Sequence, residues 1–407
     1  MTRSARPERF GAFVPLDSPP ALVAVDRILA SRLGVDGGAL WDGPDPGLGV
    51  AVLTAPTEVH VAVTERCPAG CAGCYADATP NGHEPSFAEL TDRLDALRAM
   101  GVFSVAFGGG EAALRKDIGA VAAHARRIGL SPTMTTSGLG IDAEGASKLT
   151  AFAQVNVSWD GPAELYRGVR GYDGASRAEA AIRHLRAAGI TVGINTVLTS
   201  TNYPHLSRIG EGAADLGAVE LQLLRWKPAG RGRLDYLARR LTRAQVDSFG
   251  SELRRLAERN SMAVRIDCAL VPFLAASGET SPADLARFAV MGCEAGRSLM
   301  TLDAHGGPRP CSFWDAPSDD ADGTETPAEA WQTAEALLRF RDYAANAPEP
   351  CASCDYFTVC RGGCRVVAGA AGDAFRPDPE CPRVQHEEAR LSEAGTKSAS
   401  SADDRGD

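Results

Sequence analysis

Short runs rich in β-branched residues alternate with amphipathic segments between residues 57 and 225. Six of these runs have the length and composition of strands: 58–64, 102–107, 132–137, 154–160, 190–199 and 219–224. Helices are expected between them, the first starting behind an N-cap at Ser86 and another covering 175–188, where Gly189 suits a left-handed C-cap. Strand–helix–strand units at this spacing pair in parallel. The alternation predicts an α/β fold, a partial (β/α)6 barrel whose functional groups gather at the C-terminal ends of the strands.

The regions flanking the alternation differ in character. The chain has 407 residues, of which 44% are apolar, and this is enough for two domains. We expect an N-terminal extension of unknown role over residues 1–55, a barrel over 56–240 and a bridging segment over 241–290. A cysteine-rich domain over 291–387 follows, and then a tail over 388–407 with the composition of disorder. Further helices are expected over 21–33 and 242–260. From Cys293 to Cys381 periodicity fades, which predicts loops organised around metal.

Charge and cysteine content narrow the function classes. The chain has no apolar stretch suited to a signal peptide or a membrane span, so we expect a cytoplasmic protein without membrane partners. Its net charge is 42 − 52 = −10, which argues against nucleic acid, because that binding depends on Lys and Arg. Eleven cysteines in a reducing compartment favour metal binding over disulfides.

Three cysteines follow the first expected strand directly, in the spacing C-x3-C-x2-C: Cys67, Cys71 and Cys74. Thiolates suit zinc or iron–sulfur clusters, and structural zinc normally takes four protein ligands. The nearby candidates for a fourth ligand are His60 and His83, which keeps a zinc knuckle open as an alternative. Three thiolates on a four-iron cube would leave one iron free to bind something else.

This spacing, followed by Tyr75 at the end of a first strand, is similar to that of the radical S-adenosylmethionine (SAM) enzymes. The resemblance implies a [4Fe–4S] cluster whose open iron is chelated by SAM. It also implies reductive cleavage of SAM to a 5′-deoxyadenosyl radical that abstracts hydrogen from a substrate. An electron donor such as flavodoxin or ferredoxin is the partner expected of such an enzyme.

The same resemblance implies a set of SAM contacts at the strand ends. Gly108, Gly109, Gly110 and Glu111 resemble the family's G-G-E motif, whose exposed backbone and acid meet the methionine ammonium. Further polar contacts are implied for residues ending the third, fourth and fifth strands and for an arginine in Y-R-G-V-R-G: Thr136, Ser137, Ser158, Asp160, Asn195 and Arg170, with Arg167 beside the last. The alternatives are a glycine turn and ordinary surface polar groups.

Seven further cysteines follow a second pattern, which together with Gly306 resembles the SPASM domain of radical SAM peptide-modifying enzymes: Cys293, Cys311, Cys351, Cys354, Cys360, Cys364 and Cys381. The resemblance implies two auxiliary clusters, and hence three [4Fe–4S] clusters in all. One would be held by Cys351, Cys354, Cys360 and Cys381. The other would have Cys293, Cys311 and Cys364 with one ligand missing.

The missing ligand leaves several alternatives open. The incomplete cluster has an open iron, takes a non-cysteine ligand, or is completed by Cys268, the one cysteine outside both patterns. Cys268 is otherwise a core thiol or a hydrogen-atom donor to a substrate radical. A pair of zinc ribbons would leave several of the eleven thiols without a metal.

The resemblance favours a peptide maturase that acts on a ribosomally made precursor. Auxiliary clusters can accept an electron, which favours net oxidation to a cross-link, a thioether or a dehydrogenated residue. An epimerase, a small-molecule dehydrogenase and a non-enzymatic metal-binding or electron-transfer protein are alternatives. A formylglycine-forming role is doubtful, because Ser312 stands where sulfatase-maturing enzymes have a catalytic aspartate; Asp315 lies four residues beyond Cys311.

Recognition of the precursor is less specified. Residues 1–55 are too short for a complete winged-helix recognition domain, so a separate leader-binding protein is one option. A basic run could hold an acidic leader or an electron donor, although such runs are more often solvated faces: Arg231, Arg233, Arg239, Arg240 and Arg243.

Overall fold

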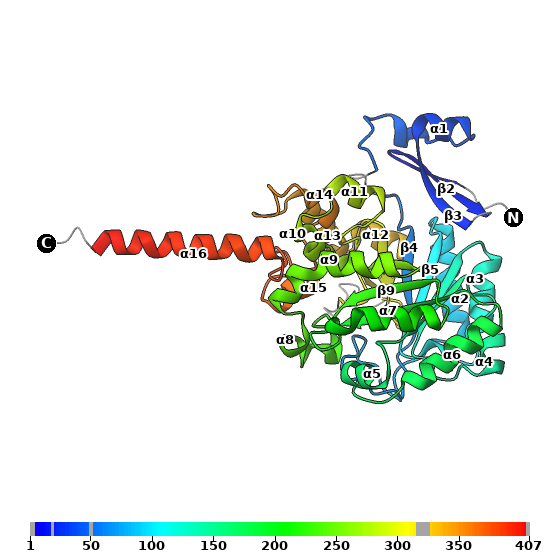
Figure 1. Ribbon diagram of the computed structural model, residues 1–407. Helices are drawn as coiled ribbons and strands as arrows, with labels where there is room; N and C mark the ends of the chain where they lie inside the picture. The colour runs from blue at the N-terminus through cyan, green and yellow to red at the C-terminus, as the bar shows by residue number, and fades with distance from the viewer. Residues whose placement is uncertain (1–4, 18–19, 49–51, 315–325, 404–407) are drawn as a thin grey trace.

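A computed structural model describes residues 5–17, 20–48, 52–314 and 326–403 of the chain (Figure 1). Its main body is a curved nine-stranded sheet with helices on the outer face and the cysteine-rich region on the other side. The strands of this sheet are β4 Glu58–Thr64, β5 Ser104–Gly109, β6 Ser131–Thr136, β7 Gln154–Ser158, β8 Val192–Leu198, β9 Glu220–Arg225, β10 Ala263–Ile266, β11 Leu299–Leu302 and β12 Pro308–Arg309.

The six predicted strands are all present as β4 to β9, and they pair in parallel and in chain order. The sheet is wider than predicted, because β10 pairs in parallel with β9 while β11 pairs in parallel with β4. β12 then pairs with β11 in the antiparallel direction. The three added strands are two to four residues long, too short to carry the period-two pattern by which a strand is predicted.

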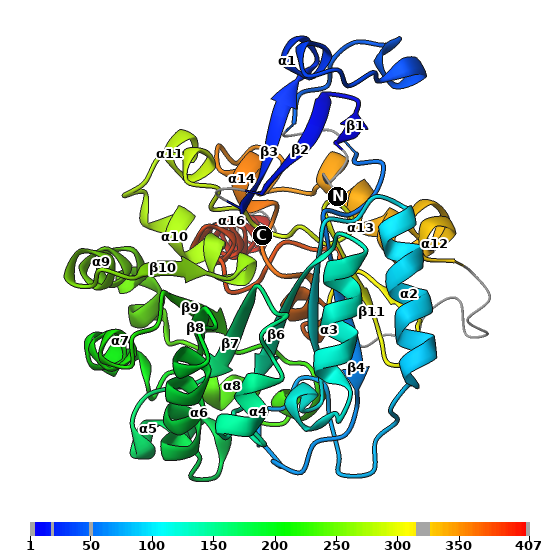
Figure 2. The ribbon, with the colours of Figure 1, turned by 90° about the vertical axis from the view of Figure 1, so that its right-hand side faces the viewer.

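Helices that follow the strands in the chain cover the outside of the barrel (Figure 2). They are α2 Phe87–Ala99, α3 Ile118–Arg127, α4 Ala143–Ser147, α5 Ala163–Arg170, α6 Ala175–Ala187, α7 Leu206–Asp215, α8 Tyr236–Arg239 and α9 Arg243–Arg259. Ser86 caps α2 in a capping box with Glu89, and Gly189 follows α6 with φ of +77°, as predicted.

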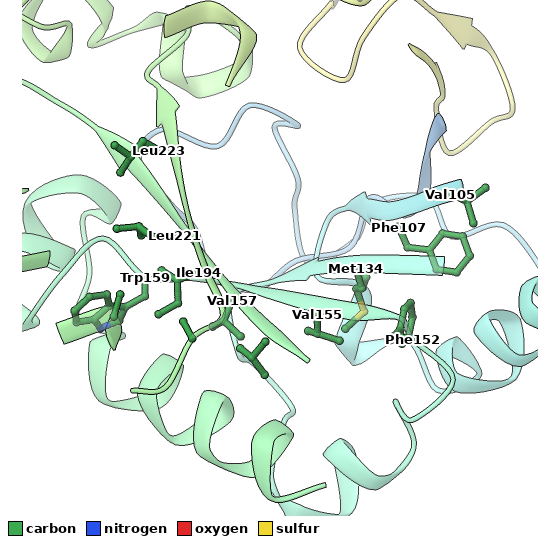
Figure 3. Close-up of a cluster of buried hydrophobic side chains, with 14 of the residues drawn as sticks. Val105, Phe107, Met134, Phe152, Val155, Val157, Trp159, Ile194, Leu221 and Leu223 are labelled. Atoms are coloured by element: carbon green, nitrogen blue, oxygen red, sulfur yellow. The ribbon is translucent and has the colours of Figure 1, made fainter. Parts of the chain in front are cut away.

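Alternate residues of each strand point outward and build the core between sheet and helices (Figure 3). Val105 and Phe107 of β5 pack there with Met134, Val155 and Ile194 from the next three strands, and all five are buried. The remaining residues of each strand face the inside of the barrel, where polar side chains predominate.

The N-terminal region forms a separate antiparallel sheet of β1 Arg6–Glu8, β2 Gly11–Asp17 and β3 Pro20–Asp26 with α1 Arg27–Arg32. The helix predicted over 21–33 is therefore wrong in its first half. That half pairs with β2, and the Asp26 side chain accepts from the Leu29 N–H at 2.7 Å, so the helix starts only after Asp26.

The cysteine-rich region is more helical than predicted. It contains α12 Pro327–Thr333, α13 Glu335–Ala345, α14 Phe357–Cys360 and α15 Arg365–Ala370, preceded by α10 Val271–Ser277 and α11 Pro282–Arg287. The tail was predicted to be disordered, but its described residues 388–403 belong to helix α16 Pro382–Asp403. This helix projects away from the body (Figure 1). Within the described ranges, no helix has the length and apolarity needed to cross a bilayer.

Candidate active site

The loop with the first three cysteines leaves β4 and is fastened to two other parts of the barrel. The Ala72 N–H donates to the Arg170 carbonyl at 2.9 Å, which joins the loop to the end of α5. On its other side, the Arg231 N–H donates to the Cys74 carbonyl at 2.9 Å, and its guanidinium donates to the Cys71 carbonyl at 3.1 Å. These bonds fix the loop at the C-terminal ends of the strands.

The three thiols of this loop are half-buried and influence one another. Burial raises the pKa of Cys67, and the charges of Glu111, Cys71 and Cys74 add to the rise. Among the described residues, no three His, Cys, Asp or Glu side chains are close enough to hold one metal ion. Both histidines proposed as a fourth zinc ligand have other partners: His60 bonds Ser312 and Glu58, and His83 stacks on His305 at 4.3 Å. Three soft thiolates with both histidines engaged fit a cluster with one open position.

The glycine run lies against the backbone of this loop. The Gly110 N–H donates to the Thr64 carbonyl at 2.6 Å, and the Glu111 N–H donates to the Arg66 carbonyl at 2.9 Å. A Cβ on Gly110 would lie 2.3 Å from the Arg66 carbonyl oxygen. Glycine is therefore required here by close approach of two backbones.

Glu111 connects the glycine run to the end of β6. Its carboxylate accepts from the Thr136 hydroxyl at 2.6 Å and from the Ser137 hydroxyl and N–H at 2.5 and 2.8 Å. Burial raises the pKa of Glu111, and these hydrogen bonds oppose the rise. The acid is 2% exposed, and its oxygens are occupied by Thr136 at the end of β6 and by Ser137, which follows it.

Asp160 is buried and pairs with Arg170, whose side chain is 17% exposed. Arg170 Nε lies 2.5 Å from Asp160 Oδ2, and the Val197 N–H donates to the other oxygen at 2.7 Å. Burial opposes the charge on Arg170, but Asp160 outweighs it and holds the pKa of the guanidinium above its usual value. Arg167 lies apart on the surface, paired with Asp173 at 3.0 Å.

The remaining predicted contacts lie on neighbouring strands. Ser158 is nearly buried at the end of β7. The Asn195 side chain accepts from Asn156 at 3.2 Å and donates to Thr135 at 3.5 Å, inside the barrel. The fold therefore brings these groups to one end of the strands, while Asn195 is already engaged by polar neighbours.

Tyr75 connects the cysteine loop with the C-terminal region. Its ring packs on Phe313 with centroids 4.6 Å apart, and its hydroxyl accepts from the Gly109 N–H. Burial and the charge of Cys74 raise the pKa of Tyr75 to about 12. Phe313 stands two residues after Cys311, so the first cysteine loop and the C-terminal cysteines lie close together.

Four cysteines gather in the first C-terminal group: Cys268, Cys293, Cys311 and Cys364. Burial raises the pKa of all four thiols. The charge of Cys293 adds to the rise at Cys268 and Cys311. The charge of Cys364 adds to the rise at Cys268, Cys293 and Cys311. Ala269, next to Cys268, belongs to the same packed cluster as Cys364 and Cys311. The Lys227 ammonium, which pairs with Asp267, opposes this rise in pKa at three of the thiols: Cys268, Cys311 and Cys364.

The second C-terminal group lines a pocket. Its four thiols are Cys351, Cys354, Cys360 and Cys381, and apolar groups such as Pro272 and Val384 complete the wall. Burial raises the pKa of Cys351 to about 11, with a further contribution from Cys381 and Cys354. Four thiols around an apolar pocket are a donor set that suits an iron–sulfur cluster.

The basic run, for which a docking surface and a solvated face were the alternatives, is largely engaged within the chain. Arg240 reaches Glu380 at 3.1 Å, Arg243 pairs with Asp247 at 2.8 Å, and Arg239 donates to the Gly168 carbonyl. Arg231 holds the cysteine loop, as described above. Asp315 lies outside the described residues.

Two polar groups were missed from the sequence. One is a chain of Ser312, His60 and Glu58 inside the barrel. The other is Arg225, whose guanidinium joins β9 to Asp378 and Glu380 in the cysteine-rich region. The only signal for the first was that His60 and Glu58 alternate with the valines of β4 and so share its inner face.

The site combines a partial parallel barrel with a three-cysteine loop and a glycine run at its strand ends. This is the arrangement expected of a radical SAM enzyme, and comparison with known proteins gives the family. The Radical SAM superfamily matches residues 61–207, which include the cysteine triad, the glycine run and β5 to β8. The mycofactocin maturase of Mycolicibacterium smegmatis is 30% identical over 347 residues, which cover 81% of this chain and 83% of that protein. The chain belongs to the radical SAM superfamily of enzymes, as its cysteine spacing predicted.

Further similarities extend over most of the chain. The PqqA peptide cyclase of Bradyrhizobium diazoefficiens is 28% identical over 337 residues, which cover 80% of this chain and 86% of that protein. The crystal structure of Streptococcus suis SuiB bound to the precursor peptide SuiA covers 93% of this chain and 98% of that one, with a TM-score of 0.70 and 16% identity. At that identity the last similarity concerns the fold alone.

Proposed function

We propose that this enzyme modifies a residue of a ribosomally made peptide by hydrogen abstraction and net oxidation, giving a cross-link, a thioether or a dehydrogenated residue. The observation that carries the proposal is the three-thiol loop fastened beside the glycine run and the Asp160–Arg170 pair. When bound there, a [4Fe–4S] cluster and SAM supply hydrogen-atom abstraction by a 5′-deoxyadenosyl radical. The names of two relatives support a peptide substrate, since one is a maturase and the other a peptide cyclase.

The chain's own residues would hold these groups in place. Cys67, Cys71 and Cys74 would ligate the cluster. Of the glycine run, Gly108 has the most room for a ligand, since a Cβ there would meet only the Tyr75 hydroxyl at 3.6 Å. Arg170, which pairs with Asp160, would face a carboxylate. Glu111 would act by orienting the Thr136 and Ser137 hydroxyls that it binds.

Cys268 is proposed as the fourth ligand of the cluster held by Cys293, Cys311 and Cys364. Support comes from its burial and from its electrostatic coupling to Cys293 and Cys364. The Lys227–Asp267 pair beside it would offset the negative charge of four thiolates. Together with the pocket thiols, this gives two auxiliary clusters that can accept an electron from the substrate.

The proposed partners are the precursor peptide and a flavodoxin or ferredoxin as electron donor, with a separate leader-binding protein as a further candidate. A peptide substrate is also supported by SuiB, which has this fold and was crystallised with its precursor peptide.

The test is anaerobic co-expression with the short peptide encoded beside this gene, followed by mass spectrometry. A loss of about two mass units supports oxidation, whereas unchanged mass with deuterium uptake supports epimerisation. Cys71→Ala should abolish 5′-deoxyadenosine formation. The proposal is contradicted if this variant still forms 5′-deoxyadenosine, or if the wild-type enzyme forms none with dithionite as reductant.

A further inference from the structure

A chain of three hydrogen-bonded side chains lies inside the barrel, apart from the SAM contacts described above. His60 Nδ1 lies 2.8 Å from Ser312 Oγ, and His60 Nε2 lies 3.1 Å from Glu58 Oε1. Thr301 Oγ1 lies 3.4 Å from Ser312 Oγ on the other side. A hydroxyl, an imidazole and a carboxylate are thus connected in a line, the arrangement by which a carboxylate orients a histidine that accepts a proton.

This line faces the barrel interior. Val59 and Val61 of β4 are buried against the outer helices, so Glu58 and His60, which alternate with them along the strand, point inward. The side chains of His60 and Glu58 remain 34% and 42% accessible. They are therefore reachable by a bound molecule and by water, unlike structural histidines sealed in a core.

The charges around His60 fix the direction of its hydrogen bonds. Burial would raise the pKa of Glu58, but bonds from His60 and Ser104 and the charge of Arg265 hold it below its usual value, so the carboxylate is ionised. An ionised carboxylate can only accept, so His60 Nε2 carries the hydrogen and Nδ1 is left to accept from the Ser312 hydroxyl. Arg265 is itself shared with Glu220 at 3.2 Å, while the other groups facing His60, Ser312 and Thr301, are neutral.

Ser312 stands at the junction of the two cysteine regions. It directly follows Cys311, and the next residue, Phe313, contacts both Tyr75 and the Lys227 ammonium. A substrate held between the cysteine loop and the first C-terminal group would therefore meet the Ser312 hydroxyl.

We propose that Ser312, His60 and Glu58 form a proton relay that removes one proton from the bound substrate. The substrate group X–H gives its proton to Ser312 Oγ while the Ser312 hydroxyl proton moves to His60 Nδ1, which leaves X⁻ and an imidazolium beside Glu58. One proton moves and no electron does. His60 then releases the proton to water through its accessible edge. The inference rests on the proposed function only in placing a substrate in the barrel.

The first experiment measures the relay without turnover. Holoenzyme is treated with diethyl pyrocarbonate at one fixed pH, and modification of each histidine is followed by peptide mass spectrometry. In Glu58→Gln the rate at which His60 is modified should differ from that in wild type, because the carboxylate that holds the hydrogen on Nε2 is gone and the tautomer is no longer fixed. His205, an exposed histidine, is the internal control, and its rate should not change. A His60 that never reacts, or a rate unchanged in Glu58→Gln, overturns the proposal.

The second experiment measures the ratio of modified peptide to 5′-deoxyadenosine. His60→Gln and Ser312→Ala should cleave SAM within about twofold of wild type while the ratio falls about 100-fold. Ser312→Thr keeps the hydroxyl and should restore most of the ratio, and His205→Gln should leave it unchanged. An unchanged ratio in Ser312→Ala overturns the relay, as does a Ser312→Thr variant no better than Ser312→Ala. If wild type forms no 5′-deoxyadenosine, the proposed function fails instead, and the modification rate of His60 still decides on the relay.

Discussion

Gly109 lies where β5 meets the cysteine loop, and its backbone has φ of +102°. A Cβ there would lie 2.3 Å from the Thr64 carbonyl oxygen, whereas a Cβ on the preceding Gly108 would meet only the Tyr75 hydroxyl at 3.6 Å. We therefore expect Gly109→Ala to destabilise the protein by at least about 2 kcal/mol, through both strain and collision. Gly108→Ala is the matched control and should change stability by less than about 1 kcal/mol. Thermal unfolding of both variants measures the difference, and equal losses would contradict the structural assignment.

Arg170 and Arg167 are one turn apart in α5 but have different surroundings. The Arg170 side chain is 17% exposed and pairs with the buried Asp160, while the Arg167 side chain is 60% exposed and pairs with Asp173. We expect Arg170→Ala to weaken SAM binding at least about tenfold, because a charge-assisted contact is lost and Asp160 is left unpaired. Arg167→Ala should bind as wild type does. Isothermal titration of the reconstituted enzyme with SAM checks both, and a variant at Arg170 with unaltered affinity would remove it from the site.

Some of these residues could be read from the sequence, and others could not. The cysteines could be proposed as ligands, because ligand spacing along the chain is itself the signal; their assignment to cluster sets stays a prediction. His60 and Ser312 could not, because 252 residues separate them and only the pairing of β11 with β4 brings them together. The SAM contact expected of Glu111 stays a prediction, and its burial depends on the Thr136 and Ser137 hydroxyls, which the sequence pattern does not position.

At the scale of elements, one buried ionic group joins β9 to the cysteine-rich region. The Arg225 guanidinium bonds Asp378 at 2.6 and 3.2 Å and Glu380 at 2.7 Å, and Asp378 also accepts from the Cys364 N–H at 3.0 Å. Asp378→Asn should cost about 3 kcal/mol, because it leaves Arg225 with less than its full countercharge in a buried setting. Asp247→Asn breaks an exposed pair with Arg243 and should cost less than about 0.5 kcal/mol.

The measurement is thermal unfolding of the loaded enzyme, with limited proteolysis to locate the first region to open. Cleavage in the cysteine-rich region should come first in Asp378→Asn. If the two Asp→Asn variants unfold alike, the ionic group does not hold the two regions together.

The elements that sequence predicted well are the long ones. All six central strands have five to seven residues with a periodic pattern, and α2 and α9 both start with a capping box. The helix predicted over 21–33 fails because strand pairing with β2 outweighs its helical periodicity. α12 and α13, between the cysteines, were missed because the cysteine spacing was interpreted as loop.

At the scale of the whole molecule, the thiols of the first cysteine loop and the pocket thiols differ in how they are built into the fold. The loop of Cys67, Cys71 and Cys74 is half-buried at the mouth of a barrel that has its own core. The pocket thiols instead join α14 to the start of α16, and their pocket is also lined by α10. A cluster held by the first loop, as proposed, would add to a structure that already exists, whereas a cluster held by the pocket thiols would contribute directly to local folding.

This difference predicts two classes of variant. Replacing Cys67, Cys71 and Cys74 together by Ala should remove about four irons per chain and leave thermal stability nearly unchanged, because the barrel core is untouched. Cys360→Ala should also lower the iron content, and in addition it should lower the unfolding temperature and expose the cysteine-rich region to protease, because the group that joins α14 to α16 is weakened. Iron and sulfide analysis, paired with thermal unfolding of the same anaerobic samples, separates the two. Equal destabilisation by both would mean that the barrel needs its own cluster to fold, and the distinction between a catalytic and a structural thiol set would be wrong.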